Sequence, residues 1–160
     1  MKRSYVPALA VGIGVVAGLR SLTAPAIISW AAREKMIRPI PSVPGRMLLA
    51  SSSKKIAELA VGELIADKLP STPSRLSTIP LTARLASGAA CGAALSVAAE
   101  EPPRNGALLG ALGALAGAFA GFYLRKRLSR NFPPFVVAVG EDLLAITAGA
   151  VIVSAVSNRE

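Results

Sequence analysis

The charged residues that could do chemistry are few, and they lie inside long apolar stretches. Arg20 lies near the middle of residues 4–32, whereas Glu141 and Asp142 are adjacent within residues 132–158. A charge at the centre of a bilayer costs roughly 2.5–3.5 kcal/mol or more, so it should be paired or face water. We therefore expect an ion pair between Arg20 and either Glu141 or Asp142. Such a pair would belong to a binding site or would only fix helix register.

Residues 47–69 carry a second group of charges. Glu63 and Asp67 are four residues apart and would share one face of a helix, which makes them alternative partners for Arg20. Six charges in this segment make a crossing expensive unless they face a bundle interior or water. A crossing helix and an amphipathic helix on the membrane surface therefore both remain open.

The backbone around Arg20 contains residues that break or bend helices. Pro25 lacks a backbone donor and clashes with the preceding turn, which predicts a kink or an unwound turn near Arg20. An exposed helix N-terminus beside an Arg would favour an anionic group. An ordinary kinked helix with glycines for close packing is the alternative. The residues concerned are Gly12, Gly14 and Gly18 before Arg20, and Ser21, Thr23 and Pro25 after it.

The composition excludes several functional classes. The 160 residues include no His and one Cys, which excludes a His-based catalytic triad, His metal ligands and an internal disulfide. A net charge of +9 would ordinarily suggest nucleic acid, but here it accompanies 52% hydrophobic and only 4% aromatic residues. We therefore expect a membrane protein with no nucleic-acid partner, no metal and no cofactor, and we do not expect an enzyme.

Four stretches poor in charge are candidate membrane helices. Residues 105–124 form an uncharged run of 20, which is long enough to cross a ~30 Å hydrocarbon core. Residues 85–99 are also uncharged and extend back to Leu81 as a helix. With 132–158 and 4–32, and with 47–69 as a fifth candidate, the sequence predicts an all-α bundle of four or five helices. Residues 1–160 would form one transmembrane domain.

The charges of the loops suggest an orientation in a bacterial cytoplasmic (inner) membrane. Residues 125–131 carry four positive charges and should be cytoplasmic, whereas 100–104 is a short acidic turn that should lie outside. Residues 4–32 either cross fully or form a re-entrant hairpin with both ends inside. Tyr5 and Trp30 resemble interface anchors, and we favour the full crossing. The basic segments should contact anionic lipid headgroups.

Glycines at short intervals predict close helix packing. Small residues let helix backbones approach each other without a hydrophobic driving force. This pattern suits packing within one chain and packing in a homodimer equally well. The glycines are Gly88 and Gly92 on one predicted helix, and Gly106, Gly110, Gly113, Gly117 and Gly121 on the next.

A short sequence recurs in the two halves of the chain. Ala-Val-Gly-Glu occurs at 60–63 and again at 138–141, and a Gly/Ala-rich segment ending in Arg precedes each copy. Small transporters are often built from two related halves with the binding site between them. The repeat suggests a duplication with halves 1–75 and 76–160, although a chance match in an Ala-rich chain is equally compatible.

Three segments together resemble a known family. AGLRSLTAP at 17–25, AVGELIADKLPSTPSR at 60–75 and GED at 140–142 are similar to the bacterial domain-of-unknown-function family four-one-two-six. The resemblance implies a small polytopic membrane protein without an assigned activity, and it contributes no catalytic residues. It draws attention to the charged residues within these segments, namely Arg20, Glu63, Asp67, Lys68, Arg75, Glu141 and Asp142.

These observations favour a small transporter or channel-like protein for an ion, a solute or a lipid headgroup. Arg20 would bind an anionic group or serve as a counter-ion, and the carboxylates would carry cation or proton coupling. The alternative is a structural or assembly subunit, packed through its glycine faces, in which the charges fix helix register.

Overall fold

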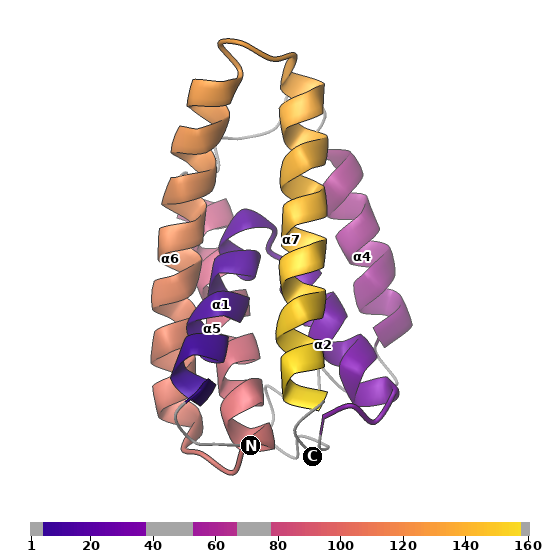
Figure 1. Cartoon of the computed structure of the whole chain (residues 1–160), viewed down its shortest axis with the longest axis vertical. Helices are drawn as coiled ribbons and strands as arrows, with labels where there is room; N and C mark the ends of the chain where they lie inside the picture. The colour runs from indigo at the N-terminus through magenta and orange to yellow at the C-terminus, as the bar shows by residue number, and fades with distance from the viewer. Residues whose placement is uncertain (1–4, 38–52, 67–77, 158–160) are drawn as a thin grey trace.

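The computed structural model describes residues 5–37, 53–66 and 78–157, and these residues form an all-α bundle (Figure 1). Six helices occur in this part of the chain, rather than the four or five expected, because residues 4–32 form two helices. The helices are α1 (Val6–Leu19), α2 (Thr23–Arg33), α4 (Ser53–Ala66), α5 (Thr78–Ala98), α6 (Pro103–Leu128) and α7 (Pro134–Ser157).

Three of these helices are long and apolar enough to cross a membrane. They are α5, α6 and α7, which match the predicted segments 81–99, 105–124 and 132–158. At 1.5 Å per residue, the 21 residues of α5 span about 32 Å and the 26 residues of α6 about 39 Å. The hydrocarbon core of a bilayer is ~30 Å thick, so each of these lengths suffices for a crossing.

The helix α6 extends further than the sequence suggested. We expected residues 125–131 to form a loop, but α6 continues through Leu128 and the chain turns between Ser129 and Pro133. Arg, Lys and Leu are good helix formers, and cations are favourable in the last turn of a helix. The positive charges of residues 125–127 therefore stabilise the end of α6, and the loop itself is shorter than expected.

The full crossing favoured for residues 4–32 is wrong, because α1 and α2 form a helical hairpin. Arg20, between the two helices, pairs with Asp142 of α7. Further along α7, Gly149 lies against Ile27 of α2 and Ile152 lies against Gly12 of α1. Both arms of the hairpin therefore run from Arg20 in the same direction, toward the C-terminal end of α7 (Figure 1).

Both ends of the hairpin lie at the same end of the bundle as the turn at residues 99–102. The helix α1 runs parallel to α6, since Gly113 lies against Val11 and Gly117 lies against Val15. The beginning of α1 thus lies near the beginning of α6, and the turn between α6 and α7 lies at the opposite end (Figure 1). The alternative in which the hairpin ends share the side of residues 125–131 is therefore also wrong.

The helix α4 accounts for only part of segment 47–69. Its 14 residues span about 21 Å, which is too short to cross a bilayer alone. It packs against α2 and is the outermost helix in that part of the molecule (Figure 1). Lys54, Lys55 and Glu58 are exposed on it, whereas Glu63 is half-buried. The rest of the segment lies outside the described residues.

The glycines of α6 pack within this one chain. A Cβ atom at Gly110 would lie 2.1 Å from the carbonyl oxygen of Gly88 on α5. On the other side, a Cβ atom at Gly14 of α1 would lie 2.2 Å from the carbonyl oxygen of Gly110. The helices α1, α5 and α6 therefore touch backbone to backbone, which positions the end of α1 and hence Arg20.

Candidate functional site

Arg20 lies at the break between α1 and α2 and is completely buried. It follows the last residue of α1 with extended backbone angles of φ −142° and ψ 113°, so the helix cannot continue through it. Its relative exposure is 0%, and its Nη2 forms an ion pair with Oδ1 of Asp142, which is itself 8% exposed. The structure thus contains the pair with Asp142, one of the ion pairs that the sequence suggested for Arg20.

The side chain of Glu63 also binds at this break, but to backbone N–H groups rather than to the Arg20 side chain. Its Oε1 accepts a hydrogen bond from the N–H of Ser21 at 2.9 Å and another from the Ser21 hydroxyl. Its Oε2 accepts a hydrogen bond from the N–H of Leu22 at 2.8 Å. Leu22 is the N-cap residue of α2 and Ser21 precedes it, so both N–H groups lie at the positive end of the helix dipole. Glu63 therefore acts as an anion bound at the beginning of α2, supplied by a separate helix.

The helix α5 contributes two polar residues near the break. The hydroxyl of Ser87 donates a hydrogen bond to the carbonyl oxygen of Ser21. Arg84 lies one turn earlier on α5 and is only 3% exposed. Sequence reasoning missed Arg84, because it considered the uncharged run 85–99 and extended the helix back to Leu81 without weighing this residue. The available signal was that Arg84 is the only charge within residues 81–99.

A second ion pair joins α6 to α7. Arg125 Nη2 lies 2.7 Å from Oε2 of Glu141, and the two side chains are 28% and 7% exposed. Consecutive residues on a helix point about 100° apart, so Glu141 and its neighbour Asp142 meet different arginines. The pairing of Glu141 was missed because Arg125 was assigned to a loop. The basic residue ahead of each Ala-Val-Gly-Glu copy was the signal that could have found it.

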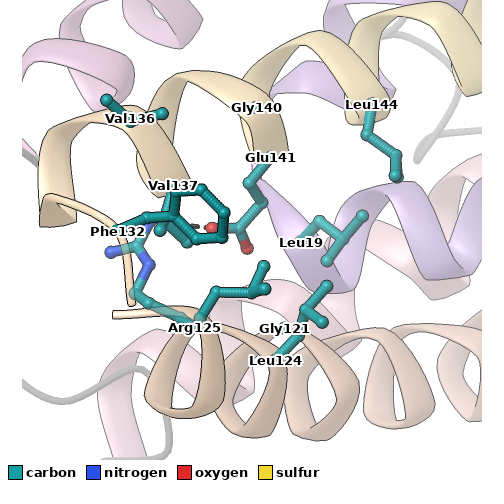
Figure 2. A pocket seen from close by; sticks show the side chains of 11 residues that line it. Leu19, Gly121, Leu124, Arg125, Phe132, Val136, Val137, Gly140, Glu141 and Leu144 are labelled. Atoms are coloured by element: carbon teal, nitrogen blue, oxygen red, sulfur yellow. Dashed lines mark hydrogen bonds and ion pairs between the residues drawn. The ribbon is translucent and has the colours of Figure 1, made fainter. Parts of the chain in front are cut away.

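A cavity of about 300 Å³ surrounds the second ion pair. It lies between α6 and α7, and Leu19 of α1 also contributes to its wall. Figure 2 shows Arg125 and Glu141 pointing toward each other among apolar side chains, which include Leu124, Phe132 and Val137. The two charged side chains that line this cavity thus form an ion pair with each other.

The remaining predicted residues divide into two groups. Asp67, Lys68 and Arg75 lie outside the described residues. The predicted glycines are buried, and six of them lie where an added Cβ would be under 3.0 Å from a neighbouring helix: Gly88, Gly92, Gly106, Gly110, Gly113 and Gly117. Gly121 instead lines the cavity between α6 and α7.

The arrangement combines a broken helix with buried charges of both signs. Glu63 binds the backbone at the beginning of α2, and the preceding residue Arg20 pairs with Asp142, so charges of both signs meet at the break. In the described part of the chain, no three His, Cys, Asp or Glu side chains gather as ligands for a metal ion. The duplication suggested by the two Ala-Val-Gly-Glu copies stays a prediction.

The comparisons with known proteins agree with the resemblance noted in the sequence. No curated protein and no solved structure matches the chain. One family does match, over residues 8–157, and this range includes both arms of the hairpin, α4 and all three long apolar helices. The chain, with three helices long and apolar enough to cross a membrane, thus belongs to the family described as Domain of unknown function (DUF4126).

Proposed function

We propose that this protein is a small transporter or channel-like protein for an ion or solute, with its binding site at the break between α1 and α2. The observation that carries the proposal is the carboxylate of Glu63 on the backbone N–H groups at the beginning of α2. In many secondary transporters, the N-termini of discontinuous helices bind anionic groups near the membrane midplane. Here a side chain of the protein occupies that position.

The Glu63 carboxylate could be released from these N–H groups by a change at α4. The helix α4 contacts α2, and Glu63 is its hydrogen-bonded link to the break. Protonation would weaken the acceptor bonds of Glu63, and an anionic solute would compete for the same N–H groups beside Arg20. Solute binding and proton uptake at Glu63 would then be coupled, with Asp142 holding Arg20 in place.

Flux measurements in proteoliposomes test this function. Vesicles that contain the wild-type protein and a pH-sensitive dye would be exposed to gradients of a broad panel of inorganic and organic ions. We expect flux above that of empty vesicles, and we expect its loss in Arg20→Ala, Asp142→Asn and Glu63→Gln. The matched control is Glu58→Gln, an exposed carboxylate on the same helix, which should retain wild-type flux. Absence of flux for every member of the panel would exclude the proposal.

A structural or assembly subunit is the second candidate. It is favoured by the complete burial of Arg20 against Asp142, because a buried pair can serve only to fix helix register. The double variant Arg20→Asp with Asp142→Arg separates the two functions. A register contact should be restored by the exchange, with recovered stability, whereas a solute site should stay inactive in the flux assay.

The proposal also covers location and partners. We place the protein in the bacterial cytoplasmic membrane, surrounded by lipid, and we assign it no catalytic step and no cofactor. A homodimer would need surfaces other than the glycine contacts between α5 and α6, because these are used within the chain.

A further inference from the structure

The cavity between α6 and α7 opens as a groove on the outside of the bundle. Although α6 and α7 are consecutive, they share few contacts, and α1 packs against both. Several apolar residues along the groove are about half exposed, including Leu124 at 51%, Phe132 at 53% and Leu144 at 52%. In a membrane-spanning bundle, such side chains face lipid rather than water.

The length of the groove fits one leaflet of a bilayer. It extends from the beginning of α7 to Leu144, which is about 15 Å at 1.5 Å per residue. Half of a ~30 Å hydrocarbon core is also about 15 Å. A hydrocarbon chain that enters from the end of α6 would therefore reach Leu144 near the bilayer centre.

The mouth of the groove is strongly basic. Arg125 forms part of its wall, and Lys126, Arg127 and Arg130 are exposed around a second hollow at the end of α6. No acidic residue occurs in the sequence between Glu101 and Glu141. The three exposed basic residues lie on the opposite side of α6 from the groove but at the level of its mouth, so they raise the positive potential there, while Arg125 alone lines the groove.

Arg125 links the mouth to the groove. One of its guanidinium nitrogens contacts Glu141, but its buried Nε makes no hydrogen bond within the described chain. A guanidinium carries five N–H donors, so Arg125 can bind a phosphate oxygen while it keeps Glu141. The ion pair would then be covered by the bound molecule and shielded from bulk lipid.

We propose that this groove binds one anionic phospholipid, with an acyl chain between α6 and α7 and the phosphate at Arg125, attracted there also by the positive charges of Lys126 and Arg127. Lipid is favoured over a partner helix because the groove is one leaflet long and ends at the basic end of α6. Leu19 and Glu141 in its wall are neighbours of Arg20 and Asp142, but Arg20, Asp142 and Glu63 do not line the groove, so this site does not depend on the proposed transport function.

Native mass spectrometry of the detergent-purified protein tests the proposal. The probes are phosphatidylglycerol and phosphatidylcholine with identical acyl chains. We expect a one-to-one complex with phosphatidylglycerol that is retained in preference to phosphatidylcholine. The variant Gly140→Phe should lose this complex, because Gly140 lines the groove and a Cβ there meets no atom within 4 Å. The added ring would therefore fill the groove without displacing the helices.

The chain offers matched controls for both parts of the site. Gly62→Phe lies in the other Ala-Val-Gly-Glu copy, where a Cβ also meets nothing within 4 Å, and it should bind as wild type does. The double variant Lys126→Gln with Arg127→Gln should bind phosphatidylglycerol about 30-fold more weakly. Arg33→Gln with Arg104→Gln removes two exposed charges at the other end of the bundle and should have no effect.

Three outcomes would overturn the proposal. Equal binding of the two lipids would exclude recognition of an anionic headgroup. Unchanged binding in Gly140→Phe would place the lipid elsewhere, and a dimer that disappears in this variant would assign the groove to a second copy of the chain. The glutamine variants lie outside the groove, so they test the headgroup site even if Gly140→Phe does not fold.

Discussion

Arg20 determines how the buried charges must be arranged, because its guanidinium is fully removed from solvent. Burying a charge is costly unless a partner and hydrogen bonds compensate it. Asp142 supplies that partner from α7, while Glu63 and Ser87 bind the backbone of Ser21 next to it. Three different helices therefore meet at two consecutive residues of the chain.

Removing the charge of Asp142 should destabilise the fold strongly. Asp142→Asn leaves Arg20 buried without its ion partner, which typically costs about 3–5 kcal/mol. We expect a clearly lower Tm in detergent, measured by a thermal-unfolding assay. The double variant Arg20→Met with Asp142→Leu should be much less affected, since it removes both charges of the pair. A double variant as unstable as the single one would show that the charge is not the cause.

At the residue scale, the sequence predicted which charges matter better than it predicted their partners. Arg20 and Asp142 stood out because charges are rare inside apolar stretches. The choice between Glu141 and Asp142 depends on how α7 is rotated, and that rotation is set by packing. Glu63 was an alternative partner for Arg20, but it binds backbone N–H groups, which no side-chain pattern reveals.

At the scale of helices, α6 is the central element, since α1 and α5 both pack closely against it. Its small residues recur at intervals of three and four, which places them on two neighbouring faces. A Cβ atom at Gly106 or Gly110 would meet α5, whereas a Cβ atom at Gly113 or Gly117 would meet α1. The predicted ridge therefore serves two contacts in one chain. The spacing indicated close packing, but it did not indicate which helices would approach.

A methyl group at Gly110 should separate these helices. The added Cβ would lie 2.1 Å from a backbone oxygen of α5, and overpacking of this kind usually costs about 1–3 kcal/mol. We expect Gly110→Ala to lower Tm. Gly140→Ala is the control, since its Cβ meets nothing and Ala favours a helix by roughly 0.5–1 kcal/mol. A Gly110→Ala protein with unchanged Tm would contradict the close approach of α5 and α6.

The position of α4 should depend on Glu63. Glu63→Gln keeps the size of the side chain but removes the charge that attracts the beginning of α2. We expect faster hydrogen exchange at the amides of α4 and at Ser21 and Leu22, followed by mass spectrometry. Glu58→Gln changes an exposed carboxylate on the same helix and should leave the exchange unaltered. Equal exchange in both variants would mean that α4 is held by its packing alone.

At the scale of the whole molecule, the sequence described the second half of the chain better than the first. Each helix from α5 onward is an apolar run long enough for one crossing, so length and composition were sufficient. The 29 residues of 4–32 suit one crossing or two half-length helices equally well. The sequence did predict a break in the helix near Arg20 and Pro25. The direction taken after it depends on distant contacts, such as that between Ile27 and Gly149.

The hairpin predicts which residues share a side of the membrane. Single cysteines would be placed at Glu34, Arg104 and Asn131, which are exposed, in a Cys91→Ala chain, and would be labelled in intact cells with an impermeant maleimide. Residues 34 and 104 should react alike, since both arms of the hairpin run toward the beginning of α6. Residue 131 should react oppositely, because it lies in the turn at the other end of α6 (Figure 1). If residues 4–32 crossed fully, residue 34 would instead be labelled like residue 131. The labelling of residue 34 therefore distinguishes the two topologies. Labelling after permeabilisation shows that each cysteine is reactive and that protection reflects sidedness rather than burial.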